Sequence, residues 1–266
     1  MKALHIQRLT KYGAFARVGF AAARAEPAEL SGRVVFFFVI LGVFSALWRA
    51  VGQDGGGAAA GRSTMVWYLA ITEWVLLSAP MLHFEIEAEV RRGDVAYQIA
   101  RPVSYVGAHV ARGIGTLALR APVLLVTAYA GGLLFAGRPP NPAVLTRVVA
   151  LGAVAIVIMT TYHVAFGLLA FWLGDIAPVY WIWQKLSFVL GGLLLPLTYY
   201  PAIVNRLAVF TPFPALLMGP ASFMLDRPFF QLPALVGLLT LWLVVGSVAA
   251  MMVFRRASRT LQLNGG

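Results

Sequence analysis

The sequence predicts an all-α polytopic membrane protein, and three observations carry that prediction. Its mean hydropathy is +0.81, and only 12% of its 266 residues are charged, roughly half the fraction in a soluble domain of this length. Several apolar runs reach the roughly 20 residues that a helix needs to cross a bilayer. These runs do not alternate in segments of about 10 residues, as the strands of a membrane β-barrel do. We expect one transmembrane domain over residues 1–266.

The first element that we expect is an amphipathic helix over residues 3–25, lying at the membrane surface within an N-terminal segment 1–32. Basic residues flank an apolar stripe at helical spacing, which suits the surface of a membrane with anionic lipid. The stripe consists of Leu9, Tyr12, Ala16 and Phe20. Pro27 and Glu29 then favour the start of a new helix, because proline and acidic residues fit a first turn. A disordered basic tail is the alternative.

Six membrane spans are expected after this segment. They cover residues 34–51, 64–83, 113–136, 144–173, 179–200 and 232–254. Turn-forming residues separate several of them, such as the Gly- and Pro-rich stretch 137–142. The fourth run is longer than a bilayer needs, so it must tilt or project beyond the bilayer.

A charged island interrupts the apolar sequence between the second and third spans, over residues 84–106. It holds four of the ten acidic residues, Glu85, Glu87, Glu89 and Asp94, and three arginines, Arg91, Arg92 and Arg101. The segment changes from acidic to basic along an amphipathic helical pattern. We therefore expect a helix outside the bilayer that docks a partner, with an ordinary solvated loop helix as the alternative.

The stretch 201–231 differs from the spans because it contains five prolines and an apolar run, 215–225, that is too short to cross. We interpret it as a broken, re-entrant segment on the external side. Irregular backbone at membrane depth requires protein or water around it, so this segment would lie beside a translocation route. An ordinary surface loop is the alternative.

Lysine and arginine counts predict the orientation. With both termini in the cytoplasm, thirteen of these residues flank the cytoplasmic ends of spans and six flank the external ends. This bias follows the positive-inside rule, so the charged island should be cytoplasmic. The same placement accounts for the net charge of +11 without nucleic acid.

The sequence lacks the patterns of common catalytic sites. None of its three lysines is followed by Ser or Thr, so it contains no P-loop and cannot hydrolyse ATP alone. It has no cysteine, and its four histidines are scattered, which makes a bound metal or cofactor improbable. We therefore do not expect an enzyme.

Three polar residues fall inside expected spans: Glu73, Arg120 and His163. Ionisable groups at this depth usually face a bundle interior or a wet cavity. Glu73 and Arg120 are candidates for a substrate path or for an ion pair with each other. A purely structural role between helices is the alternative.

Two motifs carry a resemblance to a known family. The first is Arg92–Val103, RGDVAYQIARPV, and the second runs from WLGDIAP at 172–178 to GGLLLP at 191–196 and Tyr200-Pro201. Both resemble ABC-2 type transporter permeases, in the branch described as ABC-2 family transporter protein and formerly as a domain of unknown function. The order of elements along nearly the whole chain is similar to that branch as well.

The resemblance implies a half-transporter of the bacterial cytoplasmic membrane. Such permeases pair with an identical or sister permease and bind two copies of a cytoplasmic ATPase, which holds the ATP and magnesium. Residues 84–106 would be the coupling helix and residues 1–32 the connecting helix. The docking residues would include Glu87, Arg91, Arg92, Asp94, Tyr97 and Arg101. Export is the usual direction, here of an amphipathic or hydrophobic substrate.

Two other functions remain open at this point. A self-sufficient secondary transporter or channel would use midplane charges, but it tends to contain inverted repeats that this sequence does not clearly show. A membrane assembly factor or enzyme is disfavoured by the missing catalytic pattern. An ATPase encoded beside this chain would favour the permease.

Overall fold

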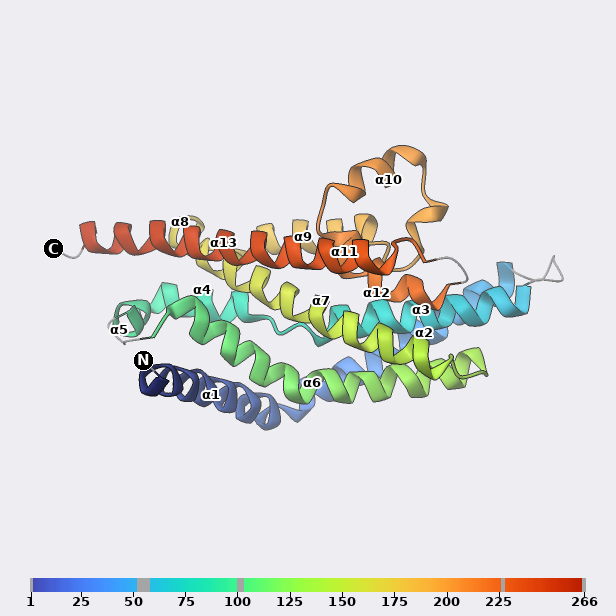
Figure 1. The fold of residues 1–266 in the computed structure, drawn as a ribbon, viewed down its shortest axis with the longest axis horizontal. Helices are drawn as coiled ribbons and strands as arrows, with labels where there is room; N and C mark the ends of the chain where they lie inside the picture. Colours follow the sequence, from blue (N-terminus) through green and yellow to red (C-terminus); the bar gives the residue numbers. More distant parts are fainter. Residues whose placement is uncertain (1, 52–57, 100–102, 226–227, 265–266) are drawn as a thin grey trace.

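The computed structural model describes residues 2–51, 58–99, 103–225 and 228–264, and every regular element among them is helical (Figure 1). The all-α fold class is therefore confirmed. In chain order the elements are α1 (Lys2–Ala25), α2 (Pro27–Val51), α3 (Ala58–Ser78), α4 (Leu82–Arg92), α5 (Val95–Ile99), α6 (Tyr105–Ala136), α7 (Pro142–Leu168), α8 (Ala170–Leu173), α9 (Ala177–Leu190), η2 (Leu197–Tyr199), α10 (Ala202–Val209), α11 (Phe213–Leu216), α12 (Met218–Ala221), η3 (Ser222–Met224) and α13 (Leu232–Asn264).

Five segments of the described chain are long and apolar enough to cross a membrane. They are Pro27–Ala50, Ser63–Arg92, Tyr105–Ala136, Pro142–Leu173 and Leu232–Arg259. The span expected over 179–200 is represented by α9, whose 14 residues rise only about 21 Å, less than the roughly 30 Å of a hydrocarbon core. Gly191 and Gly192 follow it, and Gly192 has φ of 62°. The count of six spans is therefore not confirmed.

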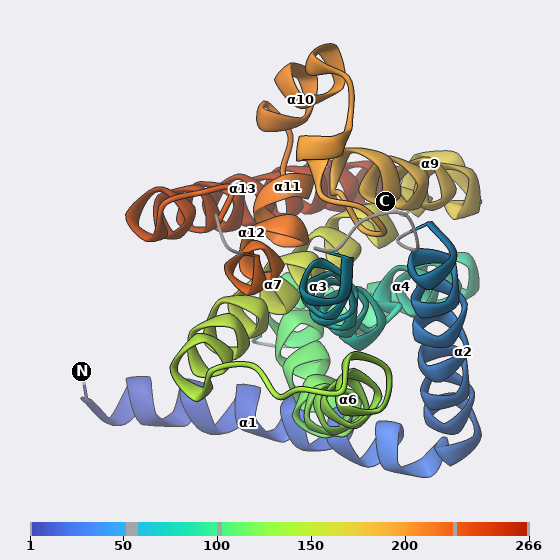
Figure 2. The ribbon, with the colours of Figure 1, turned by 90° about the vertical axis from the view of Figure 1, so that its right-hand side faces the viewer.

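Helix α3 lies at the centre of the bundle, with α2, α6 and α7 packed around it (Figure 2). Its residues 66–75 are all buried. The rings of Trp67 and Trp74 fit against neighbouring helices because those helices carry glycine at the contact. A Cβ atom at Gly132 would lie 2.3 Å from the ring of Trp67, and one at Gly152 equally close to Trp74. The largest side chains of the core thus depend on glycines of α6 and α7.

Helix α1 crosses the bundle transversely and packs along the first half of α6 (Figure 2). The two backbones approach closely. A Cβ atom at Gly19 would lie 1.9 Å from the carbonyl oxygen of Arg112, and one at Gly115 would lie 1.8 Å from that of Ala16. Phe20, which we expected on the same stripe as Ala16, is 39% exposed. The position of α1 at a membrane surface stays a prediction.

The described residues of the stretch 201–231 contain a series of short helices, as the prolines of this stretch indicate. Helix α10 projects from the bundle, whereas α11, α12 and η3 return into it (Figures 1 and 2). Residues 213–222 are all buried and pack against α3 and α7. The broken backbone is thus surrounded by protein, which is the condition for irregular structure at membrane depth. Its placement on the external side stays a prediction.

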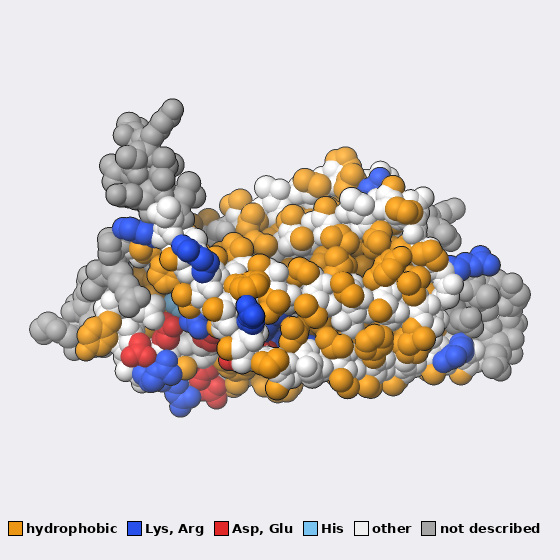
Figure 3. Space-filling view, turned by 90° about the horizontal axis from the view of Figure 1, so that it is seen from below, with side chains coloured by type: hydrophobic (Ala, Val, Ile, Leu, Met, Phe, Trp, Pro, Cys, Tyr) orange, Lys and Arg blue, Asp and Glu red, His pale blue; other side chains and the backbone are white. Residues whose placement is uncertain are grey.

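Charged side chains gather toward one end of the molecule, where α4, α5 and α8 lie (Figures 1 and 3). Helix α1 begins and α13 ends at this same end, which we call the α4–α5 end. A broad apolar surface covers the middle of the face shown in Figure 3. Exposed side chains such as Val39, Val126 and Val244 belong to the spans. An apolar exterior with charge at its ends suits a multi-pass membrane protein.

Candidate functional site

The charged island folds as two helices, α4 and α5, and not as one continuous helix over 84–106. Helix α4 ends at Gly93, whose φ of 75° is a left-handed conformation that favours glycine. The amide of Gly93 donates to the carbonyl oxygen of Val90 at 3.1 Å, and that of Asp94 donates to Glu89 at 3.0 Å. These bonds satisfy the last carbonyls of α4 and turn the chain into α5.

The inner face of α4 is fixed to the membrane-spanning part of the molecule. Leu82 and Ile86 are fully buried, in a cluster with residues of α7 such as Val164. A Cβ atom at Gly167 of α7 would lie 2.7 Å from the Cβ of Ile86, so the two helices touch closely. Any displacement of α4 must therefore act on α7.

A polar network attaches α4 to α6 through Glu89. This carboxylate is buried, accepts a hydrogen bond from the Tyr105 hydroxyl at 2.8 Å and contacts the His109 ring nitrogen Nε2 at 3.1 Å. The other ring nitrogen, Nδ1, faces the carbonyl oxygen of Tyr105 at 3.1 Å. Hydrogen bonds to a charged group in a buried site are directional and strong. The network therefore fixes the angle of α4 as well as its position.

Two other carboxylates of α4 face arginines. Glu87 pairs with Arg91 one turn along the helix at 3.1 Å, and Glu85 pairs with Arg112 of α6 at 3.3 Å. Arg91 is mainly exposed, so solvent screens its pair with Glu87. These pairs add less to the attachment of α4 than the buried Glu89 network.

The outer surface of α4–α5, as we call it, consists of Arg91, Arg92, Asp94 and Tyr97. The Arg91 and Arg92 side chains are 65% and 63% exposed, and Tyr97 is 80% exposed. Asp94 pairs with Arg92 at 2.8 Å. Arginine and tyrosine are enriched at the centres of protein interfaces. Arg101, predicted to share this surface, lies outside the described residues.

The ion pair considered between Glu73 and Arg120 is not present, because Arg120 pairs with Glu29 of α2. Glu29 also accepts a hydrogen bond from Arg33 at 2.8 Å, so two arginines share one carboxylate between α2 and α6. Glu73 is 2% exposed, and its Oε2 atom has no hydrogen-bond partner among the described residues. The sequence placed both groups inside spans, but only the packing shows which partner each one meets.

The break between α3 and α4 is held by side chains of two other helices. Pro80 lies in this break, and the carbonyls before it have lost their helical partners. Arg33 of α2 donates to the carbonyl oxygen of Leu77, and His163 of α7 contacts that of Pro80 at 2.8 Å through Nδ1. His163, a candidate from the sequence, thus holds the start of α4 in place.

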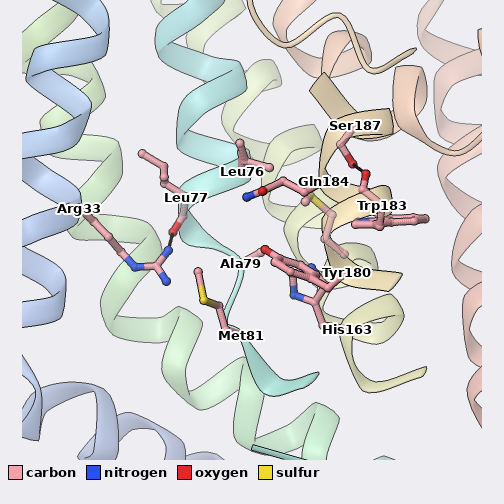
Figure 4. A pocket seen from close by; sticks show the side chains of 11 residues that line it. Arg33, Leu76, Leu77, Ala79, Met81, His163, Tyr180, Trp183, Gln184 and Ser187 are labelled. Carbon is pink, nitrogen blue, oxygen red and sulfur yellow. Dashed lines mark hydrogen bonds between the residues drawn. The ribbon is translucent and has the colours of Figure 1, made fainter. Parts of the chain in front are cut away.

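A pocket lies beside this break, between α2, α3, α7 and α9 (Figure 4). Arg33 reaches into it from one side, and His163, Tyr180 and Trp183 gather on the other, with Gln184 nearby. Its volume of about 60 Å³ admits one or two waters or a small substituent of a larger molecule. Arg33 on one side and aromatic rings on the other can receive a molecule with one polar and one apolar part.

Sequence reasoning missed several of these residues. In the sequence Arg33 is only one of the positive charges at span ends, and no pattern marks Tyr105 or His109. Tyr105 and His109 are four residues apart in a helix, a spacing that places both on one face. Nothing in the sequence indicates that this face meets Glu89.

A family model described as ABC-2 family transporter protein matches residues 63–265 of the chain. The match covers the outer surface of α4–α5, the break before α4 and three of the four helices around the pocket. Helices α1 and α2 lie before the matched residues. Comparisons with curated proteins and with solved structures gave no match.

Proposed function

Because the chain belongs to the ABC-2 family of transporter proteins, we propose that it is the permease subunit of an ABC exporter. It moves an amphipathic or hydrophobic substrate across the bacterial cytoplasmic membrane. Energy comes from ATP and magnesium bound by a separate ATPase. This family consists generally of non-catalytic membrane subunits, and membership implies an ABC ATPase as partner.

One observation carries the proposal: α4 and α5 have an exposed outer surface and an inner face tied to the spans. A partner that binds Arg91, Arg92 and Tyr97 and moves α4 would also move α6 through Glu89 and α7 through Ile86. Closure of the ATPase then biases one of two arrangements of the spans. A loosely attached surface helix would transmit no such motion.

The assembly that we propose contains two ATPase copies and a second permease, identical or sister to this one. The α4–α5 end faces the cytoplasm, with both termini on that side. Helix α1 lies against α6 at the same end, so it can contact the same ATPase. Membrane lipid surrounds the apolar surface.

The pocket beside the α3–α4 break is the part of the substrate path that we propose for the inward-facing side. Its aromatic wall and Arg33 suit an amphipathic molecule. Its small volume means that a whole substrate enters only when α9 separates from α2 and α3. Glu73 does not line this pocket among the residues described, so its role in the path stays a prediction.

The test is co-purification of the full chain with a candidate P-loop ABC ATPase. Arg91→Glu/Arg92→Glu should abolish binding, because it reverses two charges on the outer surface of α4–α5. Arg206→Glu, an exposed arginine of α10, is the control and should leave binding unchanged. Binding that survives the double change would place docking elsewhere.

Transport by the reconstituted complex provides the second measurement. Vesicles that contain permease and ATPase should export a subset of amphipathic test compounds only with ATP and magnesium, and those compounds should stimulate hydrolysis. Movement by the permease alone, driven by an ion gradient, would instead establish a secondary transporter or channel.

A further inference from the structure

A groove separates α8 from the last turns of α13 at the α4–α5 end. It is lined by Leu169 and Trp172 on one side and by Val253, Arg256 and Arg259 on the other. Its volume is about 500 Å³, several times that of the pocket beside the α3–α4 break.

The first wall of the groove is created by the end of α7. The chain turns at Leu169 into the single turn of α8, which Gly174 closes with φ of 69°. Phe171 packs into the cluster that contains Phe254, whereas its neighbour Trp172 is 48% exposed. The two rings meet edge to face at 6.3 Å. The inward Phe171 thus anchors a turn that presents Trp172 to the groove.

The second wall is one ridge of α13. A helix turns about 100° per residue, so positions three apart, such as Val253, Arg256 and Arg259, follow one side. Ala250 and Ala257 are fully buried and define the inner face of the same helix. Val253 lies about 60° around the helix from Ala250 and Arg259 about 160° from Ala257, so the groove ridge runs outward from the edge of the inner face. By the same rule Arg255 lies about 40° around the helix from Arg259 and about 100° from Arg256, so it flanks the groove ridge.

The order of residues along the groove matches the order of groups in a phospholipid. Helices α7 and α13 both run toward the α4–α5 end (Figure 1). Leu169 and Val253 therefore lie on the side of the apolar spans, and Arg256 and Arg259 follow about 4.5 Å and 9 Å further along. Tryptophan is enriched at the boundary between hydrocarbon and headgroups, which suits Trp172 as a lining residue of this groove.

We propose that this groove binds an anionic phospholipid, with its phosphate between Arg256 and Arg259 and an acyl chain against Leu169 and Val253. Guanidinium groups bind phosphate oxygens in bidentate geometry. None of the five described lining residues is acidic. Leu169 and Val253 give the groove an apolar side. An acyl chain fills this side, whereas free phosphate or an acidic protein segment does not. The site does not depend on the proposed export function.

Native mass spectrometry of the purified full chain tests the proposal, with phosphatidylglycerol and phosphatidylcholine as probes. The unmodified chain should bind one phosphatidylglycerol more tightly than phosphatidylcholine. Arg256→Gln and Arg259→Gln should each weaken phosphatidylglycerol binding about fivefold, and together about thirtyfold, because each arginine attracts anionic lipid independently. Phosphatidylcholine binding should not change.

Arg206→Gln is the matched control, since it makes the same substitution at an exposed arginine of α10 that does not line the groove. It should change phosphatidylglycerol binding less than twofold. Equal losses for Arg206→Gln and Arg256→Gln would overturn the site in favour of diffuse attraction. So would displacement of the lipid by inorganic phosphate. Loss of ATPase co-purification with unchanged lipid binding would assign the groove to a protein partner. Equal thermal midpoints of the variants would confirm that folding is intact.

Discussion

Helices α1 and α4 both lie against the first half of α6, but the two contacts are built differently. The α1 contact is a close approach of backbones, with glycine at positions 19 and 115 and no room for a Cβ atom. The α4 contact is a polar network in which Tyr105 and His109 of α6 meet Glu89. Close backbone packing fixes a distance, whereas hydrogen bonds also fix an angle. The difference indicates that a rotation of α4 is passed on to α6, whereas α1 only holds α6 at a fixed distance.

The largest expected effect concerns the centre of the α4 network. Glu89→Ala leaves the Tyr105 hydroxyl and the His109 ring buried without their shared acceptor, which should cost about 3 kcal/mol of folding free energy. Glu87→Ala, the same change two residues earlier, leaves only the exposed Arg91 without a partner and should cost about 0.5 kcal/mol. The thermal unfolding midpoints of the two variants in detergent measure this difference. Equal midpoints would show that α4 is held by apolar packing alone.

The α1 contact should break by steric overlap. Gly115→Ala places a methyl group 1.8 Å from the carbonyl oxygen of Ala16, and the forced separation should cost about 2 kcal/mol. Gly13→Ala is the control, since nothing lies within 4 Å of that position, and it should be neutral or slightly stabilising.

Separation of α1 can be measured directly because the chain has no cysteine. Ala23→Cys introduces a single, buried thiol on α1. Its labelling by a maleimide should accelerate in the Gly115→Ala background and stay slow with Gly13→Ala. Unchanged labelling in both backgrounds would mean that α1 adapts to the added methyl without leaving α6.

The types and approximate positions of most long helices could be predicted from the sequence, because apolar runs such as 232–254 have one explanation. Helix ends were harder. The run 179–200 is apolar throughout, yet α9 ends before Gly191 and Gly192, since hydropathy does not register the conformational freedom of glycine. Gly93 carried the same signal within the charged island, where it separates α4 from α5.

The candidate site was recognisable from the sequence only as a segment. The unusual density of charge marked α4 and α5, but no sequence pattern pairs Arg120 with Glu29 rather than Glu73. Such pairs depend on the rotation and height of helices relative to one another. That information lies in small residues such as Gly152 and Gly167, whose contacts become visible only in the packed structure.

A smaller effect should appear at the break where α4 begins. His163→Phe removes the contact with the carbonyl oxygen of Pro80 and should cost about 1 kcal/mol. His83→Phe is the matched control: its ring lies 4.9 Å from His163 and stacks on Tyr180. Neither ring nitrogen of His83 has a hydrogen-bond partner among the described residues. That change should be neutral or stabilising, since the stacking persists.

Unfolding midpoints again measure the two histidine variants. If His163→Phe proves neutral as well, the break is held by Arg33 alone, and the polar attachment of α4 is confined to Glu89. A loss confined to His163→Phe extends that attachment to both ends of α4, in contrast to the close backbone contact of α1.

The smallest effect on stability is expected at the outer surface of α4–α5. Asp94→Ala removes an exposed ion pair with Arg92, and Tyr97→Ser removes a ring that is 80% exposed. Each should change the folding free energy by less than about 0.5 kcal/mol. Tyr97→Ser should nevertheless weaken ATPase co-purification about tenfold, since exposed tyrosines contribute strongly to interfaces. A loss of ATPase binding without a loss of stability would distinguish this surface from the Glu89 network, where substitution should mainly reduce stability. Destabilisation by Tyr97→Ser would instead mean that α5 contributes to the stability of the fold.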